Sequence, residues 1–444
     1  MRGYALPSFA LLGAVAPARA WTFSKISSGG GAAAGTLTLS GVGAGPFDPS
    51  HCANWLRDER APLIAPRAAG SCPGNIYAAS AVNNGGAVNV FFGGWDGVSS
   101  CHDSVSVAVT ENDFESFGGH VPAVATGAEM HVNNPSAIKL PDGSWGMMYT
   151  QLPRAPAPPL NKPGFSTSAD GVAFAPGAGG AAQLVTMHGY ANWEAADVNG
   201  GNVLVYAPSG GKTSDSSGSI NNSTGSSVGG SFHMYFVDFA AGNHSVYHAT
   251  ADASNRVAGA PLAFSYAGIA LQERGRVPND VKLINGHWVL GLHANSQQTY
   301  MSSVAGGGPP STWPASHMLF RHRDAADKYI VSVGLVVDDA ATTLRGVLYG
   351  AGAVPQLDNN RVFATWLQRR AIFRSSDNAT VWGVGNAASA HGPEKAVLLT
   401  NAASMAGRWF LYDANYVDEH SPGTLLAVSP QVTVTTGDVW HATN

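Results

Sequence analysis

Several acidic side chains of this chain stand next to a tryptophan or a histidine, close to the ends of predicted β-strands. Cleavage of a glycosidic bond needs two carboxyl groups across the scissile bond: one is protonated and releases the leaving oxygen, and the other is ionised and activates water or attacks. A tryptophan beside a carboxyl group offers a flat apolar face to a sugar ring. The residues of these types that we expect on one face of the fold are Trp95, Asp96, His102, Asp103, His131, Asn134, Trp193, Glu194, Asp280 and His293.

Glu194 is the best candidate for the proton donor. It follows Trp193 in an otherwise apolar stretch, where desolvation would raise the pKa of its carboxyl group and keep that group protonated. Asp197 is a poor partner, because side chains alternate between the two faces of a strand and residues three apart point in opposite directions. We therefore expect Asp197 to be structural. The candidate partners are Asp103, which is our first choice, Asp96 and Asp280, and the predicted catalytic set is Glu194, Asp103 and Asp280.

Each of these residues also has a purely structural interpretation. An Asp or Asn at a strand end commonly accepts hydrogen bonds from turn amides, and a histidine beside a strand is more often a surface or core residue. A further alternative is a lyase or another enzyme that uses His102, His131 or His293 as its base. These histidines lack the spacing of metal ligands, so we expect neither a metal nor another cofactor. The residues expected to bind substrate are Trp95, Asp96, His102, His131, Asn134, Trp193 and His293.

A repeated pattern of three strands predicts the fold. Each unit has a short apolar strand that opens at a polar tip, a strand rich in aromatic and β-branched residues, and a strand that ends in small Ser- and Thr-rich residues. In the second unit a Pro-Asp-Gly turn at residues 141–143 separates the first two strands, as in a β-hairpin. Five such units predict an all-β protein with a five-bladed β-propeller. The five units begin at Asn75, Asn134, Glu194, Asn279 and Tyr329.

The ends of the chain suggest export and a small addition to the propeller. Residues 1–20 have a positive start, an apolar stretch and an Ala-Arg-Ala cleavage motif, which predicts a signal peptide and a secreted protein. Residues 21–59 form a Gly-rich segment, and residues 60–374 hold the five units. Residues 375–444 hold only short strand-like runs, which we expect to complete the last blade or to form a small β cap. A Gly-, Ser- and Asn-rich stretch at 209–231 predicts a surface loop inside the third unit.

Composition favours a neutral partner. Charged residues make up 12% of the chain and the net charge is −5, which is too weak to suggest nucleic acid or an anionic membrane. We expect a monomer whose partner is a carbohydrate. The three cysteines, Cys52, Cys72 and Cys101, permit one disulfide. We prefer Cys72 with Cys101, because both are expected on one face of the propeller, but three unpaired thiols are an equal alternative.

The units resemble those of the five-bladed β-propeller glycoside hydrolases, the superfamily that holds families 43 and 32. The resemblance rests on the Asn-Pro-Ser-Ala-Ile run that starts at Asn134, on the Glu-Ala-Ala-Asp-Val run that starts at Glu194, and on the recurrent third-strand phrase, and it spans about residues 60–370. It implies a glycosidase in which Glu194 is the general acid.

Two positions depart from the family. The aspartate that tunes the acid in blade two is matched by Asn134, and the base or nucleophile position in blade one falls on Ala78. Neither side chain can perform the family role. Either another carboxylate, with Asp103 the first choice, replaces the missing one, or the propeller binds sugar without cleaving it. The leading hypothesis is a secreted hydrolase of a furanoside or a related polysaccharide linkage, and the alternative is a non-catalytic carbohydrate-binding propeller.

Overall fold

The computed structural model describes two compact units, which are treated separately. One unit comprises Pro49–Gln368 and His391–Pro393, and the other comprises Met1–Asp48, Arg369–Ala390 and Glu394–Asn444. The described residues are 20–26, 36–40, 55–58, 60, 62–65, 75–93, 104–112, 114–124, 131–152, 160–174, 183–208, 229–242, 245–256, 261–284, 286–294, 296–322, 325–337, 344–355, 360–367, 371–374, 381–386, 396–399, 405–413, 424–434 and 439–442.

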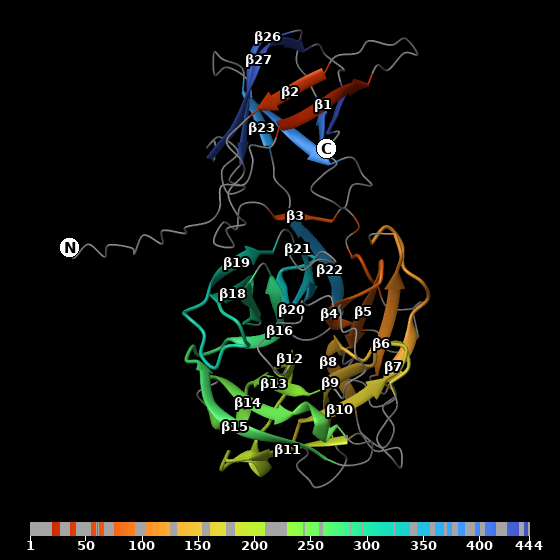
Figure 1. The fold of residues 1–444 in the computed structure, drawn as a ribbon, viewed down its shortest axis with the longest axis vertical. Helices are drawn as coiled ribbons and strands as arrows, with labels where there is room; N and C mark the ends of the chain where they lie inside the picture. The colour runs from red at the N-terminus through yellow and green to blue at the C-terminus, as the bar shows by residue number, and fades with distance from the viewer. Residues whose placement is uncertain are drawn as a thin grey trace, which may run out of the picture. The chain divides into compact units, whose positions relative to one another are not determined.

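The larger unit is a five-bladed β-propeller of antiparallel four-stranded sheets (Figure 1). Blade one contains β4 (Tyr77–Asn84), β5 (Ala87–Gly93), β6 (Val105–Thr110) and β7 (Val121–Val124). Blade two contains β8 (His131–Lys139), β9 (Trp145–Leu152), β10 (Lys162–Ser168) and β11 (Gln183–His188). Blade three contains β12 (Val203–Pro208), β13 (Gly230–Phe236), β14 (Val246–Asp252) and β15 (Leu262–Leu271).

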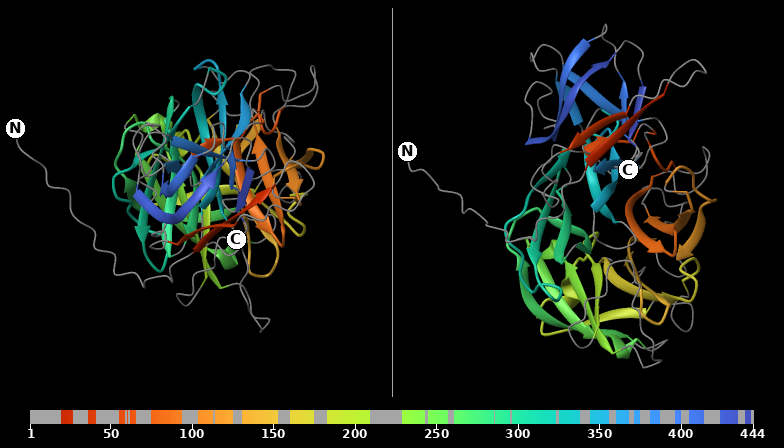
Figure 2. Two further views of the ribbon diagram at one scale, coloured as in Figure 1. Left: turned by 90° about the horizontal axis from the view of Figure 1, so that it is seen from above. Right: turned by 45° about the horizontal axis from the view of Figure 1, so that its top comes forward.

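Blades four and five complete the ring. Blade four contains β16 (Val277–Ile284), β17 (His287–His293), β18 (Gln298–Ala305) and β19 (His317–Arg321). Blade five contains β20 (Tyr329–Val337), β21 (Leu344–Gly352), β22 (Arg361–Leu367) and, as its outer strand, β3 (Trp55–Arg57). The outermost strand of the last blade therefore comes from the start of the propeller sequence, which closes the ring. Figure 2 shows the same sheets from two further directions.

Blades two and three are also joined at their outer edges. The outer strands β11 and β15 pair in parallel from Val185 with Leu262 to His188 with Ser265, so the two blades form one eight-stranded sheet. This pairing satisfies backbone groups that an edge strand would otherwise leave open.

The blades pack through apolar faces. Each neighbouring pair of blades buries at least one aromatic pair, with ring centroids 4.9–6.0 Å apart, in the range where such pairs stabilise one another. Going round the ring, the pairs are Phe91–Trp145, Phe165–Phe232, Tyr235–Trp313, Phe320–Tyr349 and Phe114–Trp366.

The smaller unit is a closed antiparallel sheet of eight described strands. Their order is β1-β2-β27-β26-β23-β24-β25-β28, and β28 pairs with β1. The strands are β1 (Ala20–Ile26), β2 (Thr36–Ser40), β23 (Ala371–Arg374), β24 (Val381–Asn386), β25 (Ala396–Leu399), β26 (Met405–Asp413), β27 (Thr424–Val434) and β28 (Val439–Ala442).

The predicted all-β, five-bladed propeller is confirmed, and the differences lie at the edges of the units. The repeat pattern has three strands where each blade has four. The outer strands β7, β19 and β3 have only three to five residues, whereas the longer β11 and β15 were not recognised as parts of the pattern. The propeller unit runs from residue 49 to 368 rather than from 60 to 374. Residues 21–26 and 36–40, expected in a Gly-rich segment, pair instead with strands from the end of the chain.

Three expectations from the sequence fall on parts of the chain without a described structure. Residues 1–19 of the predicted signal peptide, the stretch at 209–228 and the three cysteines lie outside the described residues. Within the described part of the chain, no helix is long and apolar enough to cross a membrane.

Candidate functional site

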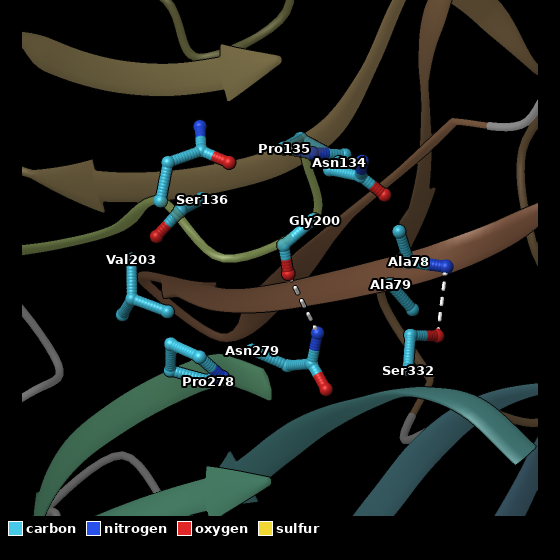
Figure 3. Close-up of a pocket in the computed structure, with 11 residues that line it drawn as sticks. Ala78, Ala79, Asn134, Pro135, Ser136, Gly200, Val203, Pro278, Asn279 and Ser332 are labelled. Atoms are coloured by element: carbon cyan, nitrogen blue, oxygen red, sulfur yellow. Dashed lines mark hydrogen bonds between the residues drawn. The ribbon is translucent and has the colours of Figure 1, made fainter. Parts of the chain in front are cut away.

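The five inner strands surround a pocket on the propeller axis (Figure 3). Its lining comes from or immediately before β4, β8, β12, β16 and β20, close to the residue where each of these strands begins. The cavity has a volume of about 10 Å³, which is enough for one water-sized group. The lining residues are Ala78, Ala79, Asn134, Pro135, Ser136, Gly200, Asn202, Val203, Pro278, Asn279 and Ser332.

Irregular backbone turns these residues toward the axis. The pairing of β4 with β5 shifts register between Tyr77 and Ser80, and the same kind of shift occurs in β8, β16 and β20. Bulges of this kind redirect side chains and are common beside functional sites. Ala78 and Asn134 sit in these shifts with φ angles of 57° and 52°. Asn tolerates the left-handed conformation, whereas for Ala it is strained.

Hydroxyl and carboxyl groups of the inner strands tie neighbouring blades together. The Ser80 hydroxyl accepts a hydrogen bond from the Ala137 N–H of the next blade at 3.3 Å, and the Ser136 hydroxyl accepts one from the Leu204 N–H at 2.9 Å. The ring closes where the Ser332 hydroxyl accepts from the Ala78 N–H at 2.8 Å. These contacts hold the pocket walls at fixed separations.

Asp280 occupies the corresponding position in blade four, which corrects its predicted catalytic role. Its carboxylate is buried, accepts a hydrogen bond from the Leu335 N–H at 2.8 Å and lies 3.4 Å from the Lys282 ammonium. Burial raises the pKa of Asp280, and the charge of Lys282 opposes this effect. The pocket is lined instead by the residues before it, Pro278 and Asn279, in the register shift of β16. Asp280 therefore links blades rather than facing a substrate.

Amide groups form the polar part of the pocket. Asn134 Nδ2 donates to Asn199 Oδ1 at 3.0 Å and to Asn133 Oδ1 at 2.8 Å, which leaves Asn134 Oδ1 without a donor among the described residues. The Thr150 hydroxyl donates to Asn202 Oδ1 at 3.1 Å. Asn202 Nδ2 is buried and has no hydrogen-bond partner among the described residues. The lining thus offers both an acceptor and a donor.

His293 lies outside the lining and contacts the lining residue Asn279. Its Nδ1 lies 2.6 Å from Asn279 Oδ1, and Asn279 Nδ2 donates to the Gly200 carbonyl at 3.3 Å. Because Nδ2 is engaged with a carbonyl, Oδ1 accepts, and His293 must donate through Nδ1. His293 was predicted to bind substrate; it is buried and does not line the pocket, so it positions Asn279.

Glu194 and Trp193 lie on a short 3-10 helix, η2 (Trp193–Ala195), and not at a strand tip. The Glu194 side chain is exposed rather than in an apolar environment. Trp193 is buried against Phe236 with ring centroids 6.0 Å apart, so it is a packing residue and not a platform for a sugar. The Lys162 ammonium donates to the carbonyls of Trp193, Glu194 and Ala196 at 2.5–3.1 Å and holds this helix in place.

Asp197, which we expected to be structural, follows the helix η2 and does not share a strand with Glu194, so the alternation of side chains along a strand does not apply to this pair. The Asp197 carboxylate accepts hydrogen bonds from the Asn161 backbone N–H at 3.0 Å and side-chain Nδ2 at 2.8 Å. The Asn161 amide also contacts His131, which is partly buried at the start of β8. Trp95, Asp96, His102 and Asp103 lie outside the described residues.

Sequence reasoning missed Asn202, the lining residue of blade three. We placed the start of the third unit at Glu194, whereas the inner strand is β12, which begins at Val203. An available signal was the Val-Leu-Val-Tyr run after Asn202, which matches the apolar runs that follow the polar openings of the other units. With this correction, Glu194 is not the blade-three residue that opens the inner strand.

No model of a known protein family and no curated protein matches the chain. Solved structures with a similar fold include a glycosyl hydrolase from Bacteroides ovatus, at 12% identity over 70% of this chain and 93% of that chain, with a TM-score of 0.47. A second is the catalytic domain of a GH62 α-L-arabinofuranosidase from Coprinopsis cinerea, at 15% identity over 72% and 98% of the two chains, with a TM-score of 0.47. A third is an exo-β-1,3-galactanase from Phanerochaete chrysosporium, at 10% identity over 88% and 96%, with a TM-score of 0.40.

These similarities concern the fold. The names describe the activities of those enzymes, and at such identities and TM-scores no activity carries over to this chain. The propeller assignment rests on the strand order of its own five sheets. The expected resemblance to five-bladed glycoside hydrolases therefore holds at the level of architecture.

Proposed function

We propose that this glycoside hydrolase-like propeller binds a neutral carbohydrate at its axial pocket. The observation that carries the proposal is the lining: three Asn and two Ser residues, and no ionisable residue among the described residues that line it. Amide and hydroxyl groups suit sugar hydroxyls, which both donate and accept hydrogen bonds. A charged ligand would have no counter-charge there.

The size of the pocket limits what enters it. A volume of about 10 Å³ admits one hydroxyl-sized group but not a sugar ring. We therefore infer that an arm of the sugar, such as a hydroxyl or a hydroxymethyl group, enters the pocket while the ring stays at its mouth. Asn202 Nδ2 and Asn134 Oδ1 supply the donor and the acceptor for such an arm.

Calorimetric titration of neutral oligosaccharides against the wild type and two variants tests this proposal. Asn134→Gly removes the amide and keeps a residue that accepts the positive φ, so we expect affinity to fall at least tenfold. Asn192→Gly is the matched control, because Asn192 is exposed and its side chain makes no capping hydrogen bond; its affinity should equal that of the wild type. Equal affinity of Asn134→Gly and the wild type, or the absence of binding to any neutral oligosaccharide, would contradict the proposal.

Hydrolysis is the second candidate function. It is favoured by the Glu194 carboxylate, which is exposed on a helix whose carbonyls are fixed by Lys162. In this proposal Glu194 is the acid and Asp103 is the base or nucleophile. An assay of released reducing ends from a polysaccharide panel should then show activity that Glu194→Gln and Asp103→Asn abolish. Glu115→Gln, at another exposed position, is the control, and turnover that is unchanged in Glu194→Gln would exclude this mechanism.

We also propose that the protein is exported as a monomer after removal of residues 1–20. Expression with the native N-terminus should give an extracellular protein that begins at Trp21 and elutes at the size of one chain. An intracellular protein that keeps Met1 would contradict export, and a larger assembly would contradict the monomer.

A further inference from the structure

His131, Asn161 and Asp197 form a connected series of side chains on segments that lead toward residues of the pocket lining. His131 Nε2 lies 3.1 Å from Asn161 Oδ1. Asn161 Nδ2 donates to Asp197 Oδ1 at 2.8 Å, and the Asn161 backbone N–H donates to the same oxygen at 3.0 Å. The three residues come from the start of β8, the segment before β10 and the segment before β12.

This series determines which nitrogen of His131 carries the proton. A carboxylate only accepts hydrogen bonds, so the Asn161 atom that faces Asp197 is the NH₂ group and the atom that faces His131 is the carbonyl oxygen. That oxygen also only accepts, so His131 must donate through Nε2. In the neutral imidazole the other nitrogen, Nδ1, is then an acceptor. Among the described residues Nδ1 has no hydrogen-bond partner, and it is not fully buried.

His131 and Asp197 each precede a residue of the pocket lining by a short stretch of chain. His131 is three residues before Asn134 on β8, and Asp197 is three residues before Gly200; Asn134 and Gly200 both line the pocket. The two walls are joined directly by the hydrogen bond from Asn134 Nδ2 to Asn199 Oδ1. Three residues of strand span at most about 10 Å, which is within the size of one sugar ring with its arms.

We propose that His131 forms a second subsite at the rim of the axial pocket, where its Nδ1 accepts a hydrogen bond from a hydroxyl of the bound neutral carbohydrate. This inference rests on the proposed function. Asp197 and Asn161 are positioning residues that hold the ring and its tautomer. The subsite makes binding sensitive to pH, because protonation converts Nδ1 from an acceptor into a donor, and the sugar hydroxyl must then give up its own hydrogen bond to Nδ1 and turn to accept one.

The direction of this pH dependence follows from the surroundings of His131. Burial lowers the pKa of His131 below its ordinary 6.5, although the hydrogen bond with Asn161 opposes this effect. The charged groups linked to it are Asp197, which acts through Asn161, and Asp238, which accepts from the Asp197 N–H. The charges of Asp197, Asp238 and Glu194 in turn act on Lys162, the residue after Asn161. Affinity should be constant above the pKa of His131 and fall below it to the level that the contacts with Asn134 and Asn202 maintain.

The first test measures the affinity of a neutral oligosaccharide bound by the wild type, by calorimetry between pH 7.5 and 5.0. We expect the wild type to weaken as the pH falls. His131→Gln keeps a donor toward Asn161, but its acceptor Oε1 does not lie at the position of Nδ1 and the amide does not titrate, so it should bind at least fivefold more weakly at pH 7.5 and show no pH dependence. His188→Gln, at an exposed histidine on β11, should behave like the wild type. Equal affinity and equal pH dependence of His131→Gln and the wild type would overturn the inference and leave the proposed function standing, whereas failure of the wild type to bind at pH 7.5 would overturn both.

The second test does not depend on a variant that folds. Nitrogen NMR of the histidine rings in the wild-type protein should show His131 protonated at Nε2 and unprotonated at Nδ1 at pH 7.5, with a shift of the Nδ1 signal when oligosaccharide is added. A proton on Nδ1, or an Nδ1 signal that does not respond to bound oligosaccharide, would overturn the inference.

Discussion

His233 Nδ1 lies 3.0 Å from His248 Nε2, across the paired strands β13 and β14. The two ring planes are nearly parallel, with an interplanar angle of 14°, and His248 also packs on Tyr235. Burial lowers the pKa of both imidazoles to about 4, and His248 further lowers that of His233. Blade three therefore contains two histidines that are neutral when folded at pH values where an unfolded chain would protonate them.

This pair should make the propeller sensitive to acid. Between about pH 6.5 and pH 4 the unfolded chain binds more protons than the folded one, so the free energy of unfolding falls as the pH falls through this window. The expected loss between pH 7 and pH 4.5 is roughly 5 kcal/mol for the pair, with each histidine contributing half of it. Urea denaturation of the wild type and of His248→Phe at pH 7, 5.5 and 4.5 checks this. The variant should lose distinctly less stability over the window, and an equal loss would exclude the pair as the cause.

A second prediction concerns the closure of the ring at Asp58. Its buried carboxylate accepts hydrogen bonds from Arg60 Nε at 3.0 Å, Arg60 Nη2 at 2.9 Å and Trp366 Nε1 at 2.8 Å, while Arg60 Nη1 donates to the Phe114 carbonyl of blade one. Asp58→Ala leaves the Trp366 donor buried without its partner, so we expect the free energy of unfolding to fall by about 3 kcal/mol. Glu111→Gln, at an exposed site, should change stability by less than about 0.5 kcal/mol. Denaturant titration of both variants measures the difference in their stability. Equal unfolding midpoints would contradict a role of Asp58 in closing the ring of blades.

Asp58 also predicts behaviour at low pH. Burial raises the pKa of its carboxyl group, but the hydrogen bonds from Arg60 and Trp366 outweigh burial, and the pKa is lowered below the ordinary 3.8. A depressed folded pKa contributes stability above the unfolded pKa and loses it as the pH falls through the folded value. At neutral pH the wild type should have a larger free energy of unfolding than Asp58→Asn, and this difference should disappear below about pH 4. A difference in the free energy of unfolding between the two proteins that stays constant from pH 5 to pH 3 would contradict the lowered pKa of Asp58.

The strained backbone at Ala78 gives a third prediction. Ala78→Gly removes the penalty of the positive φ at 57° and should raise stability by up to about 1 kcal/mol. Ala81→Gly is the matched control on the same strand, because Ala81 is also buried and has no positive φ; it should lower stability by about 1 kcal/mol. Thermal unfolding of the two variants should therefore shift in opposite directions, and equal losses would show that Ala78 is not strained.

Asp280 provides a fourth prediction, which separates a structural from a catalytic role. Asp280→Asn leaves the Lys282 ammonium buried without its counter-charge, so stability should fall by about 3 kcal/mol. Affinity for carbohydrate, or turnover if the protein has any, should stay unchanged for each folded molecule. Denaturant titration combined with calorimetry separates the two effects. A loss of affinity or turnover without a loss of stability would show that Asp280 takes part in binding or catalysis.

Most of the fold could be predicted from local sequence patterns, as the second blade illustrates. The Pro-Asp-Gly turn at 141–143 predicts the hairpin of β8 and β9, and Gly143 adopts a φ of 83° there. The outer strand β3 was not predictable, because a three-residue strand carries almost no periodic signal and its partner β22 is about 300 residues away. Pairing over such a distance depends on the whole ring closing.

The candidate site was harder to predict from the sequence than the fold, and Glu194 shows the reason. A polar residue before an apolar run marks the opening of an inner strand, but the runs after Glu194 and after Asn202 both fit this description. The 3-10 helix η2, with Trp193 buried and Lys162 bound to its carbonyls, depends on contacts from other segments. Asn134 was recognised because the Asn-Pro-Ser run and the following turn are both local.

A crystal structure of the protein with a bound neutral oligosaccharide tests most directly whether a neutral sugar places one hydroxyl-sized arm in the axial pocket. We expect a sugar oxygen within hydrogen-bond distance of Asn134 Oδ1 or Asn202 Nδ2, with the ring at the mouth beside His131. A sugar bound elsewhere on the propeller, with no oxygen in contact with Asn134, Asn202 or Asn279, would contradict this placement.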